Sequence, residues 1–464
     1  MYEDDGLSPT GVRLLHLLCF PWSDRIHARP VYAGSCELQR SLKLPAAMAE
    51  IKPLRALHYD PAVAGPLDRL TAPPYDVIDA AERRALVAKS PYNVVEIDLP
   101  EGADPYGHAS ELLDAWRLQG IVVQDSAPAL WALTQTFTGP DGSQRTRHGF
   151  FAKVRVEDYG PGRIRPHERT HPAAKEDRLR LMRATRANLS PIFTLYPDAG
   201  GRAWAALEPA TAGAPWGEVT DDEGTTHRLW RVTDAGAIAE AEAALADAEL
   251  LIADGHHRYE TARVYAEEIG GEGAHRYVLM CLVSMSDPGL AVFPTHRLVG
   301  GLDDARRRRL DEVMRSEFEL TEVGPDELVP SSRNGELPSF GFLEAGSDRT
   351  LRLDLTSQEV ADRALAGHSD SYRRLDTAVL EKLILEDALG LTEDDISHQR
   401  GLGYARDLDQ ARALLRTGNY DLAFLLRPTP VEQVQAVAAA GETMPPKSTY
   451  FYPKLLSGLL FNPL

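Results

Sequence analysis

The sequence predicts a mixed α/β protein, and three kinds of segment support this prediction. Short apolar runs such as 250–252 are typical of buried strands, and longer stretches such as 109–119 have helical periodicity. The tetrapeptide 139–142, Gly-Pro-Asp-Gly, lies between two strand-like runs and has the composition of a tight reversal. Strands that alternate with helices, together with an antiparallel hairpin, indicate a mixed sheet.

The predicted elements follow one another from residue 94 onward. In the first half the apolar pattern predicts the strand 94–99, the helix 109–119, and the strands 121–123, 129–137 and 145–156. In the second half it predicts a helix from 235, the strand 250–252, a helix 259–269, the strands 277–284 and 290–299, the helices 303–317, 377–389 and 407–417, the strand 420–426 and the helix 431–440.

Three regions are predicted along the chain. Residues 1–47 lack periodicity, and we expect them to be a non-native or disordered extension, with translation starting at Met48. Residues 48–234 form an N-terminal mixed α/β region, and residues 235–464 form a C-terminal α/β region. The segment 324–337 is rich in loop-forming residues and indicates a joint between subdomains.

Length and composition are typical of a globular protein. The 464 residues suggest about two to three folding units, and the hydrophobic fraction of 43% and charged fraction of 26% are ordinary values. The three cysteines fit neither a disulfide framework nor a zinc site. No apolar run reaches the roughly 18 residues that a membrane helix needs. We therefore expect a cytoplasmic protein without a membrane span.

The net charge of −19 makes nucleic acid an unexpected partner, because non-specific binding to phosphate backbones depends on clustered Lys and Arg. A small anionic molecule can still be bound locally, so we expect a small-molecule substrate. The oligomeric state is open.

A polar segment, Asp254-Gly255-His256-His257-Arg258, joins the strand-like run 250–252 to a helical pattern. Glycine allows a close approach of the backbone to a ligand, and the free N–H groups of a helix start attract anions. An arginine can bind two phosphate oxygens at once. Phosphate binding is therefore the simplest functional interpretation of this segment.

Two alternatives remain for the same segment. In a purely structural role, Asp254 caps the helix and the histidines bind neighbouring carbonyls. In a metal site, His256 and Glu260 have a usable i, i+4 ligand spacing, although His256 and His257 diverge around the helix. The sequence leaves the metal unknown.

A second polar segment, 163–171, contains His167 and Glu168 directly after Pro166. Proline breaks regular structure, so both residues are expected on a loop, where a carboxylate can act as a general base. Glu168 is the candidate base and His167 a candidate substrate-binding residue. The alternative is a solvated, charged turn.

Three further segments contribute candidate binding residues. His296 and Arg297 lie at the end of an apolar strand, where polar groups are well placed to face a cleft. The segment 444–454 gathers hydrogen-bond donors beside aromatic residues, although it lacks the glycines of a P-loop. The proline-rich segment 71–78 presents a tyrosine and an aspartate, either for a pocket wall or for a rigid turn. The candidates in the segment 444–454 are Lys447, Ser448 and Thr449. Those in the segment 71–78 are Tyr75 and Asp76.

Five segments taken together resemble the domain-of-unknown-function family 1015 from Met48 to the C-terminus. They are Ala72-Pro-Pro-Tyr-Asp-Val-Ile, Pro166-His-Glu-Arg-Thr, Ala253-Asp-Gly-His-His-Arg-Tyr-Glu-Thr-Ala, Pro294-Thr-His-Arg and Met444-Pro-Pro-Lys-Ser-Thr-Tyr-Phe-Tyr-Pro-Lys. The segment at Asp254 is also similar to the motif of the ParB/sulfiredoxin superfamily, which includes the free serine kinases.

This resemblance implies a ParB/sulfiredoxin-like core around the motif, with additional mixed-sheet subdomains. It implies that Asp254, His256, His257 and Arg258 hold phosphates, and that Glu168 deprotonates an acceptor hydroxyl. The implied cofactor is ATP, ADP or pyrophosphate, with Mg²⁺.

The leading hypothesis is an enzyme that transfers phosphate to a small hydroxyl compound such as free serine. Positioning and charge neutralisation are what phosphoryl transfer mostly needs, and Arg258, Arg297 and Lys447 can supply positive charge. Two alternatives are a nucleotide-binding switch or ParB-like regulatory module, and a metal-dependent phosphoesterase that uses His167, Glu168, His256 and His257.

Overall fold

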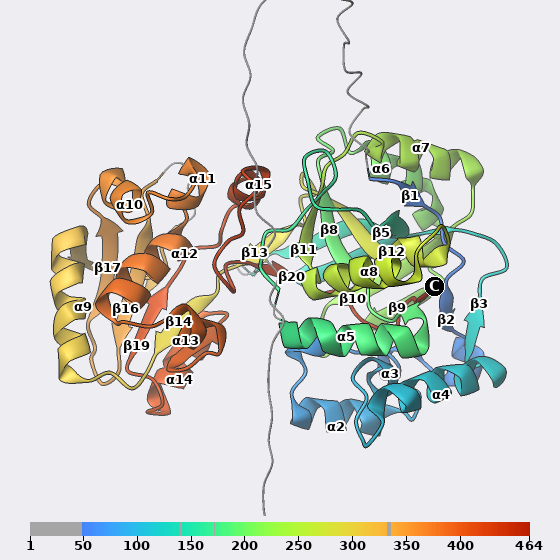
Figure 1. The fold of residues 1–464 in the computed structure, drawn as a ribbon, viewed down its shortest axis with the longest axis horizontal. Helices are drawn as coiled ribbons and strands as arrows, with labels where there is room; N and C mark the ends of the chain where they lie inside the picture. The colour runs from blue at the N-terminus through green and yellow to red at the C-terminus, as the bar shows by residue number, and fades with distance from the viewer. Residues whose placement is uncertain (1–48, 140–141, 171, 332–335) are drawn as a thin grey trace, which may run out of the picture. The chain divides into compact units, whose positions relative to one another are not determined.

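The computed structural model describes residues 49–464 except 140–141, 171 and 332–335. Its largest element is a nine-stranded mixed sheet, and a second sheet has six strands (Figure 1). The predicted mixed α/β class is therefore confirmed, and the second sheet is antiparallel throughout. The predicted extension 1–47 lies outside the described residues.

The nine-stranded sheet has the order β6-β11-β8-β12-β5-β4-β10-β9, with β1 paired to β5. Parallel pairing occurs between β11 and β6 and between β12 and β8. Strands from both predicted regions, 48–234 and 235–464, belong to this sheet. Their bounds are β1 Ile51–Lys52, β4 Leu130–Thr138, β5 Gln144–Arg155, β6 Ile164–Arg165, β8 Ile192–Tyr196, β9 Gly217–Thr220, β10 Thr226–Val232, β11 Leu250–Asp254 and β12 Tyr277–Ser284.

Both faces of this sheet are buried. In β12 the side chains of Val278, Met280 and Leu282 belong to one hydrophobic core. Those of Leu279, Cys281 and Val283 belong to another. A strand that is covered on both faces has a continuous apolar run rather than an alternating one. This explains why the run 277–284 predicts β12 correctly.

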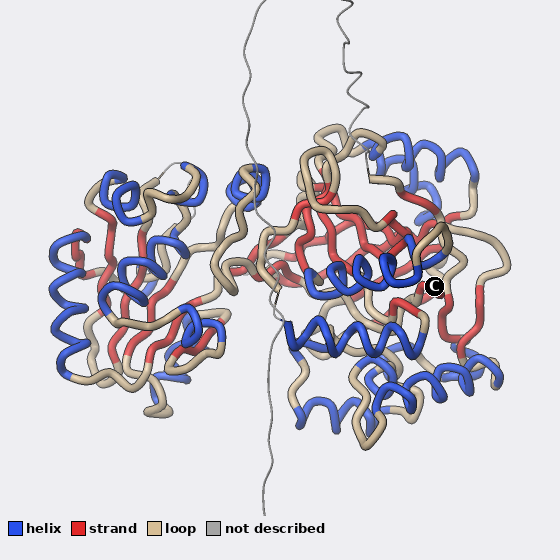
Figure 2. Tube along the Cα trace, viewed as in Figure 1, coloured by secondary structure: helices blue, strands red, loops and turns tan. Residues whose placement is uncertain are grey.

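Helices surround the sheet, as the blue segments of Figure 2 show. The helices α5 and α8 are in contact with each other, and so are α6 and α7. The helical bounds in this part are α1 Pro61–Ala64, α2 Ala80–Lys89, α3 Val95–Asp98, α4 Pro105–Leu118, α5 Pro172–Thr185, α6 Arg202–Leu207, α7 Ala235–Leu245 and α8 His256–Ile269.

The six-stranded sheet has the order β15-β17-β16-β19-β14-β18. One of its hydrophobic cores includes the π-helix Leu380–Ala388, and another includes α14. The strands are β14 His296–Val299, β15 Phe318–Glu322, β16 Ser339–Glu344, β17 Thr350–Leu355, β18 Leu402–Ala405 and β19 Leu422–Leu425. The helices are α9 Asp304–Glu317, α10 Gln358–Ala364, α11 Asp370–Arg373, α12 Asp376–Val379, α13 Glu393–Ser397, α14 Leu408–Arg416 and α15 Val431–Ala439.

The C-terminal segment 440–464 returns from the six-stranded sheet to the elements around the larger one. It pairs β20 (Tyr450–Tyr452) with β13 (Ala291–Phe293), and β21 (Asn462–Pro463) with β7 (Ala187–Asn188). The backbone N–H of Met444 donates to the carbonyl of His167. Residues near the end of the chain thereby reach the segment that carries the candidate base.

Two strand predictions are corrected by the structure. The run 94–99 forms the short helix α3 instead of a strand, because a short apolar run does not distinguish a strand from a buried helical turn. The run 290–299 is divided into β13 and β14 at Pro294 and Thr295, and the two strands join different sheets. The helix 377–389 forms as α12 followed by the π-helix.

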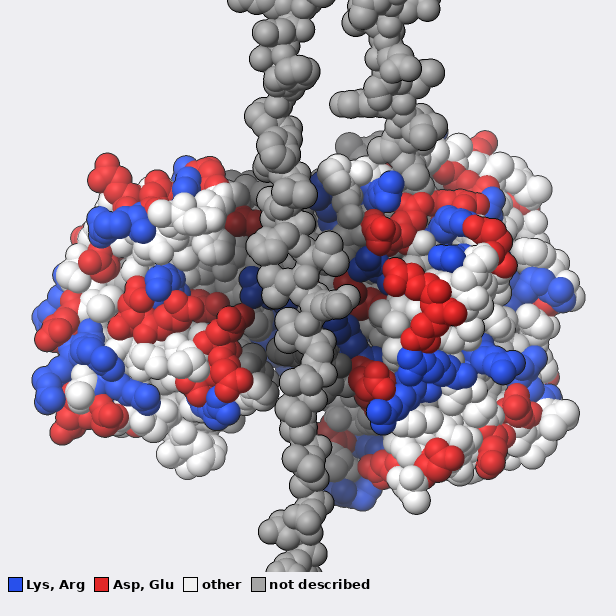
Figure 3. Space-filling model, viewed as in Figure 1, with Lys and Arg blue, Asp and Glu red and all other residues white. Residues whose placement is uncertain are grey.

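Among the described residues, no helix combines the length and apolarity that crossing a membrane requires. In Figure 3 acidic and basic side chains are intermixed over much of the face in view, where the described residues are visible.

The buried guanidinium of Arg147 holds the C-terminal segment onto the large sheet. It donates to Gln135 Oε1 at 3.0 Å and to the carbonyls of Tyr452 and Pro453 at 3.2 and 2.6 Å. Burial lowers the pKa of Arg147 to about 10. Its removal would leave two buried carbonyls without this donor, and an unsatisfied buried polar group is costly.

We predict that Arg147→Met lowers the free energy of unfolding by about 3 kcal/mol, measured by urea denaturation. The control is Arg228→Met, because Arg228 lies on β10 with a side chain that is 39% exposed in a surface pair with Glu218. Surface pairs of this kind contribute about 0–1 kcal/mol. Equal losses in the two variants would contradict the role of Arg147.

Candidate functional site

The polar segment begins at the end of β11, where the pairing with β8 is irregular. Ile252 pairs with Thr194 and Asp254 pairs with Phe193, so that Ala253 is an extra residue in the ladder. Such a bulge changes the direction in which the following side chain points. The helix α8 then starts at His256, three residues earlier than the predicted start at Tyr259.

Asp254 is held by two cations. Its Oδ1 accepts a hydrogen bond from Lys454 Nζ at 2.8 Å, and its Oδ2 accepts one from Arg258 Nη2 at 2.6 Å. Burial alone would raise the pKa of this carboxyl, but Lys454 and Arg258 lower it well below its usual range. The residue before α8 is Gly255, with no side-chain cap. The alternative in which Asp254 only caps the helix is therefore wrong.

Gly255 adopts a φ of +96°, which L side chains rarely adopt. A Cβ at this position would lie 2.9 Å from Arg258 Nε. The missing side chain of Gly255 therefore first of all allows the Arg258 side chain to lie close to the backbone. The guanidinium donates to Asp254 and also to the carbonyl of Pro191, so two of its donors are already engaged within the protein.

His167 and His256 lie in a buried network behind the motif. His167 Nδ1 is 2.7 Å from the carbonyl of Ile252, and its Nε2 is 2.9 Å from Thr449 Oγ1. A neutral His167 donates from Nδ1 and accepts at Nε2. The backbone N–H of His167 in turn donates to His256 Nε2 at 3.3 Å. Burial lowers the pKa of both histidines, that of His256 far below its usual range.

A cleft of about 400 Å³ lies over this motif, and its volume is in the range of small-molecule sites. Ten of the predicted site residues line the cleft and come from widely separated parts of the sequence. They are Tyr75, Asp76, Glu168, Asp254, Gly255, His256, His257, Arg258, Lys447 and Thr449.

Four predicted residues do not line the cleft. His167 is buried, and the Ser448 hydroxyl donates to the Pro445 carbonyl at 2.6 Å and lies 3.0 Å from Thr377 Oγ1. His296 Nδ1 accepts from the backbone N–H of Leu426, and burial lowers the pKa of His296 to about 4. Arg297 donates to the carbonyls of Thr295 and Pro446. These side chains support the loops of the cleft, because their donors and acceptors are used inside the protein.

Lys447 and Glu168 are two candidate residues whose charge is available in the cleft. Lys447 is exposed and has a φ of +57°, a strained conformation for a residue with a side chain. The carboxylate of Glu168 makes no hydrogen bond or ion pair within the part of the chain that the structure describes. Backbone strain of this kind is concentrated at functional sites.

Thirteen of the 23 residues that line the cleft were not among the predicted site residues. They include Tyr404, Arg406, Tyr450 and Lys454. Lys454 has the clearest geometry, since it contacts Asp254 and its Nζ lies 4.6 Å from the centre of the Tyr450 ring. In the sequence it stands out only as a lysine close to three aromatic residues, a pattern that also fits a packed C-terminal tail.

Within the described ranges, no three His, Cys, Asp or Glu side chains are grouped so that they could hold a metal ion. His167 uses both ring nitrogens, and His256 Nε2 accepts a backbone N–H. A metal site at these two histidines has therefore no support in the geometry.

We predict that His256 and His296 stay neutral when the pH falls from 7 to 5.5, as measured by imidazole ¹⁵N chemical shifts. Burial lowers the folded-state pKa of His256 far below its usual value of about 6.5, and that of His296 to about 4. Because the unfolded chain takes up these protons first, the two histidines contribute stability above about pH 6.5 that is lost as the pH falls toward 4. Imidazolium shifts for these rings at pH 5.5 would contradict the prediction.

Comparisons with known proteins give one family and several distant structures. None of the curated proteins matches the chain. A conserved hypothetical protein from Pyrococcus furiosus is 15% identical, with a TM-score of 0.32, and the match covers 62% of this chain and 86% of that protein. A free serine kinase in complex with AMP is 14% identical, with a TM-score of 0.33, and the match covers 62% of this chain and 83% of the kinase.

SbnI with a C-terminal truncation, from Staphylococcus aureus, is 13% identical, with a TM-score of 0.34, and the match covers 66% of this chain and 85% of that protein. The model of one protein family matches residues 51–378, which is more than half of the chain. The chain therefore belongs to the protein family of unknown function DUF1015.

Proposed function

We propose that the cleft binds the phosphates of a nucleotide or pyrophosphate and transfers a phosphoryl group to the hydroxyl of a small compound, with free serine as the first acceptor to test. The observation that carries this proposal is the combination of an available lysine, Lys447, with an available carboxylate, Glu168, in one cleft. Phosphoryl transfer needs charge neutralisation and a positioned acceptor more than it needs covalent chemistry.

The proposed step assigns a separate task to each group. The acceptor oxygen attacks the phosphorus atom, its proton passes to the Glu168 carboxylate, and the bond between phosphorus and the leaving oxygen breaks. The electron pair of that bond remains on the donor product. Lys447 and Lys454 stabilise the charge of the phosphates, and Asp254 holds Lys454 in place.

The motif contributes through orientation. His256 and His257 begin α8, whose first N–H groups have no side-chain cap, and this arrangement favours a phosphate at the helix start. Arg258 adds positive charge at the cleft wall while its donors fix Asp254. We propose in addition that this strand-turn-helix is a ParB/sulfiredoxin-like core.

Mg²⁺ fits this site as an ion held mainly by the donor. It commonly binds one or two protein carboxylates together with substrate phosphates. The exposed carboxylate of Asp76 at the cleft wall would hold it. The ion would supply further neutralisation of phosphate charge.

We predict that Lys447→Ala weakens the affinity for ADP and for pyrophosphate by about tenfold, since one charge-assisted contact contributes on the order of 1.5 kcal/mol. Isothermal titration calorimetry measures both affinities. The control is Lys52→Ala, which removes a lysine that is 47% exposed on β1, outside the cleft. Unchanged affinity in Lys447→Ala would separate this lysine from the phosphates.

We predict that Glu168→Gln reduces turnover by at least about a hundredfold, because the amide cannot accept the proton, and leaves nucleotide affinity nearly unchanged. The assay incubates the protein with serine and ATP, ADP or pyrophosphate and detects O-phosphoserine. Equal turnover in Glu168→Gln and wild type would end the assignment of the base. Nucleotide binding without any phosphorylated acceptor would favour the regulatory switch instead.

A further inference from the structure

A second cavity, of about 540 Å³, adjoins the cleft. Five residues line both: Val77, Tyr404, Arg406, Tyr450 and Lys454. A ligand larger than a phosphate group can therefore extend from the cleft past Lys454 into the second cavity. The volume of each is in the range of small-molecule sites.

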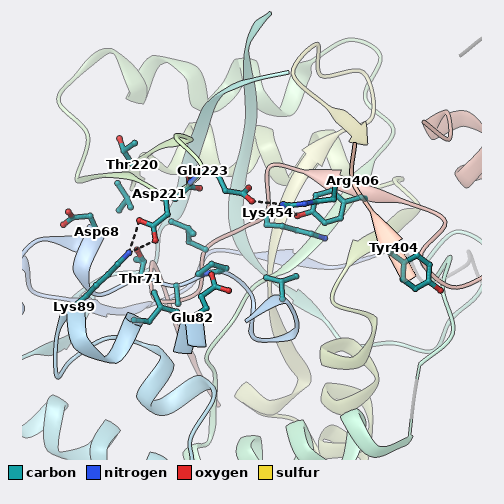
Figure 4. Close-up of a pocket in the computed structure, with 18 residues that line it drawn as sticks. Asp68, Thr71, Glu82, Lys89, Thr220, Asp221, Glu223, Tyr404, Arg406 and Lys454 are labelled. Carbon is teal, nitrogen blue, oxygen red and sulfur yellow. Dashed lines mark hydrogen bonds and ion pairs between the residues drawn. The ribbon is translucent and has the colours of Figure 1, made fainter. Parts of the chain in front are cut away.

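The walls of the second cavity suit a neutral, partly flat group. Leu86, Val219 and Leu456 contribute apolar surface, and Tyr450 contributes a ring. In Figure 4 the cations Arg406 and Lys454 lie toward one side of the cavity, while Asp68 and Glu82 lie toward the other, together with Lys89. Arg406 and Lys454 thus supply positive charge on the side that this cavity shares with the cleft, whereas Lys89 on the other side is neutralised by its pair with Asp222.

Carboxylates make the remote side unsuitable for phosphate. Asp222 is paired with Lys89 at 2.7 Å on this side, whereas Glu223 lies toward the cleft, where it is paired with Arg406 at 2.7 Å. Asp68 and Glu82 make no ion pair within the described part of the chain. A phosphate would be repelled here, whereas hydroxyl groups can donate to such carboxylates, as the ribose hydroxyls of dinucleotides do to Asp or Glu.

We infer that the phosphate donor is a nucleoside phosphate rather than pyrophosphate, and that its nucleoside occupies the second cavity. This inference rests on the proposed function of the cleft. The base packs against Leu86, Val219 and Leu456, and the ribose hydroxyls donate to the carboxylates. Lys454 then lies where the nucleoside ends and the phosphates begin, so the charge of the ligand changes where the charge of the protein changes.

The test fills the second cavity and leaves the cleft intact. Thr220, at the end of β9, is exposed and lines only the second cavity. We expect Thr220→Trp to weaken ADP binding at least about tenfold in isothermal titration calorimetry, and to change pyrophosphate binding less than about twofold. Thr138→Trp is the matched control, because Thr138 is an exposed strand threonine outside both cavities. It should change neither affinity.

Competition in the wild-type protein gives a second measurement that needs no variant. Saturating adenosine should weaken ADP binding and leave pyrophosphate binding unchanged, because adenosine and pyrophosphate occupy different cavities. Displacement of pyrophosphate by adenosine would overturn the inference, and so would equal affinities for ADP and pyrophosphate that Thr220→Trp does not alter. Absence of binding by either phosphate compound to wild-type protein would instead refute the proposed function itself.

Discussion

The ion pair between Asp254 and Lys454 is the interaction on which the arrangement of the site depends. It joins the end of β11, the second strand from one edge of the large sheet, to a residue 200 positions later, in the segment that crosses back from the six-stranded sheet. Both partners are largely buried, with side-chain exposures of 18% and 16%. A buried charge without a partner is strongly destabilising, so the pair fixes the lysine at the junction of the two cavities.

The charges near the cleft divide into those that build it and those that remain available. Arg258 and Arg297 direct donors to backbone carbonyls and so determine the course of the chain around Pro191 and Pro446. Lys447 follows Pro446 directly and stays exposed. The rigid cations thus set the geometry, and the available ones can meet a ligand. A site built in this way is organised before the ligand arrives, which lowers the cost of binding.

Much of the fold was predictable from local pattern. The strands β11 and β12 and the helices α4, α7 and α9 lie close to their predicted bounds, because continuous apolar runs and helical periodicity are strong local signals. Two other strand predictions were wrong, or the predicted strand was divided in two, for a reason that is not local. The run 94–99 is a helical turn inside a core, and the break at Pro294 and Thr295 separates strands of two sheets.

The sequence by itself determined the family signature, the strand-turn-helix around Asp254 and ten of the 23 residues that line the cleft, since these depend on residue type and short spacing. Only the tertiary structure decided that His167, His296, Arg297 and Ser448 are buried supports rather than cleft residues. It also decided the position of Lys454 and the existence of a second cavity. The physical reason is that burial and ion pairing arise from contacts between segments far apart in the chain, which no local pattern records.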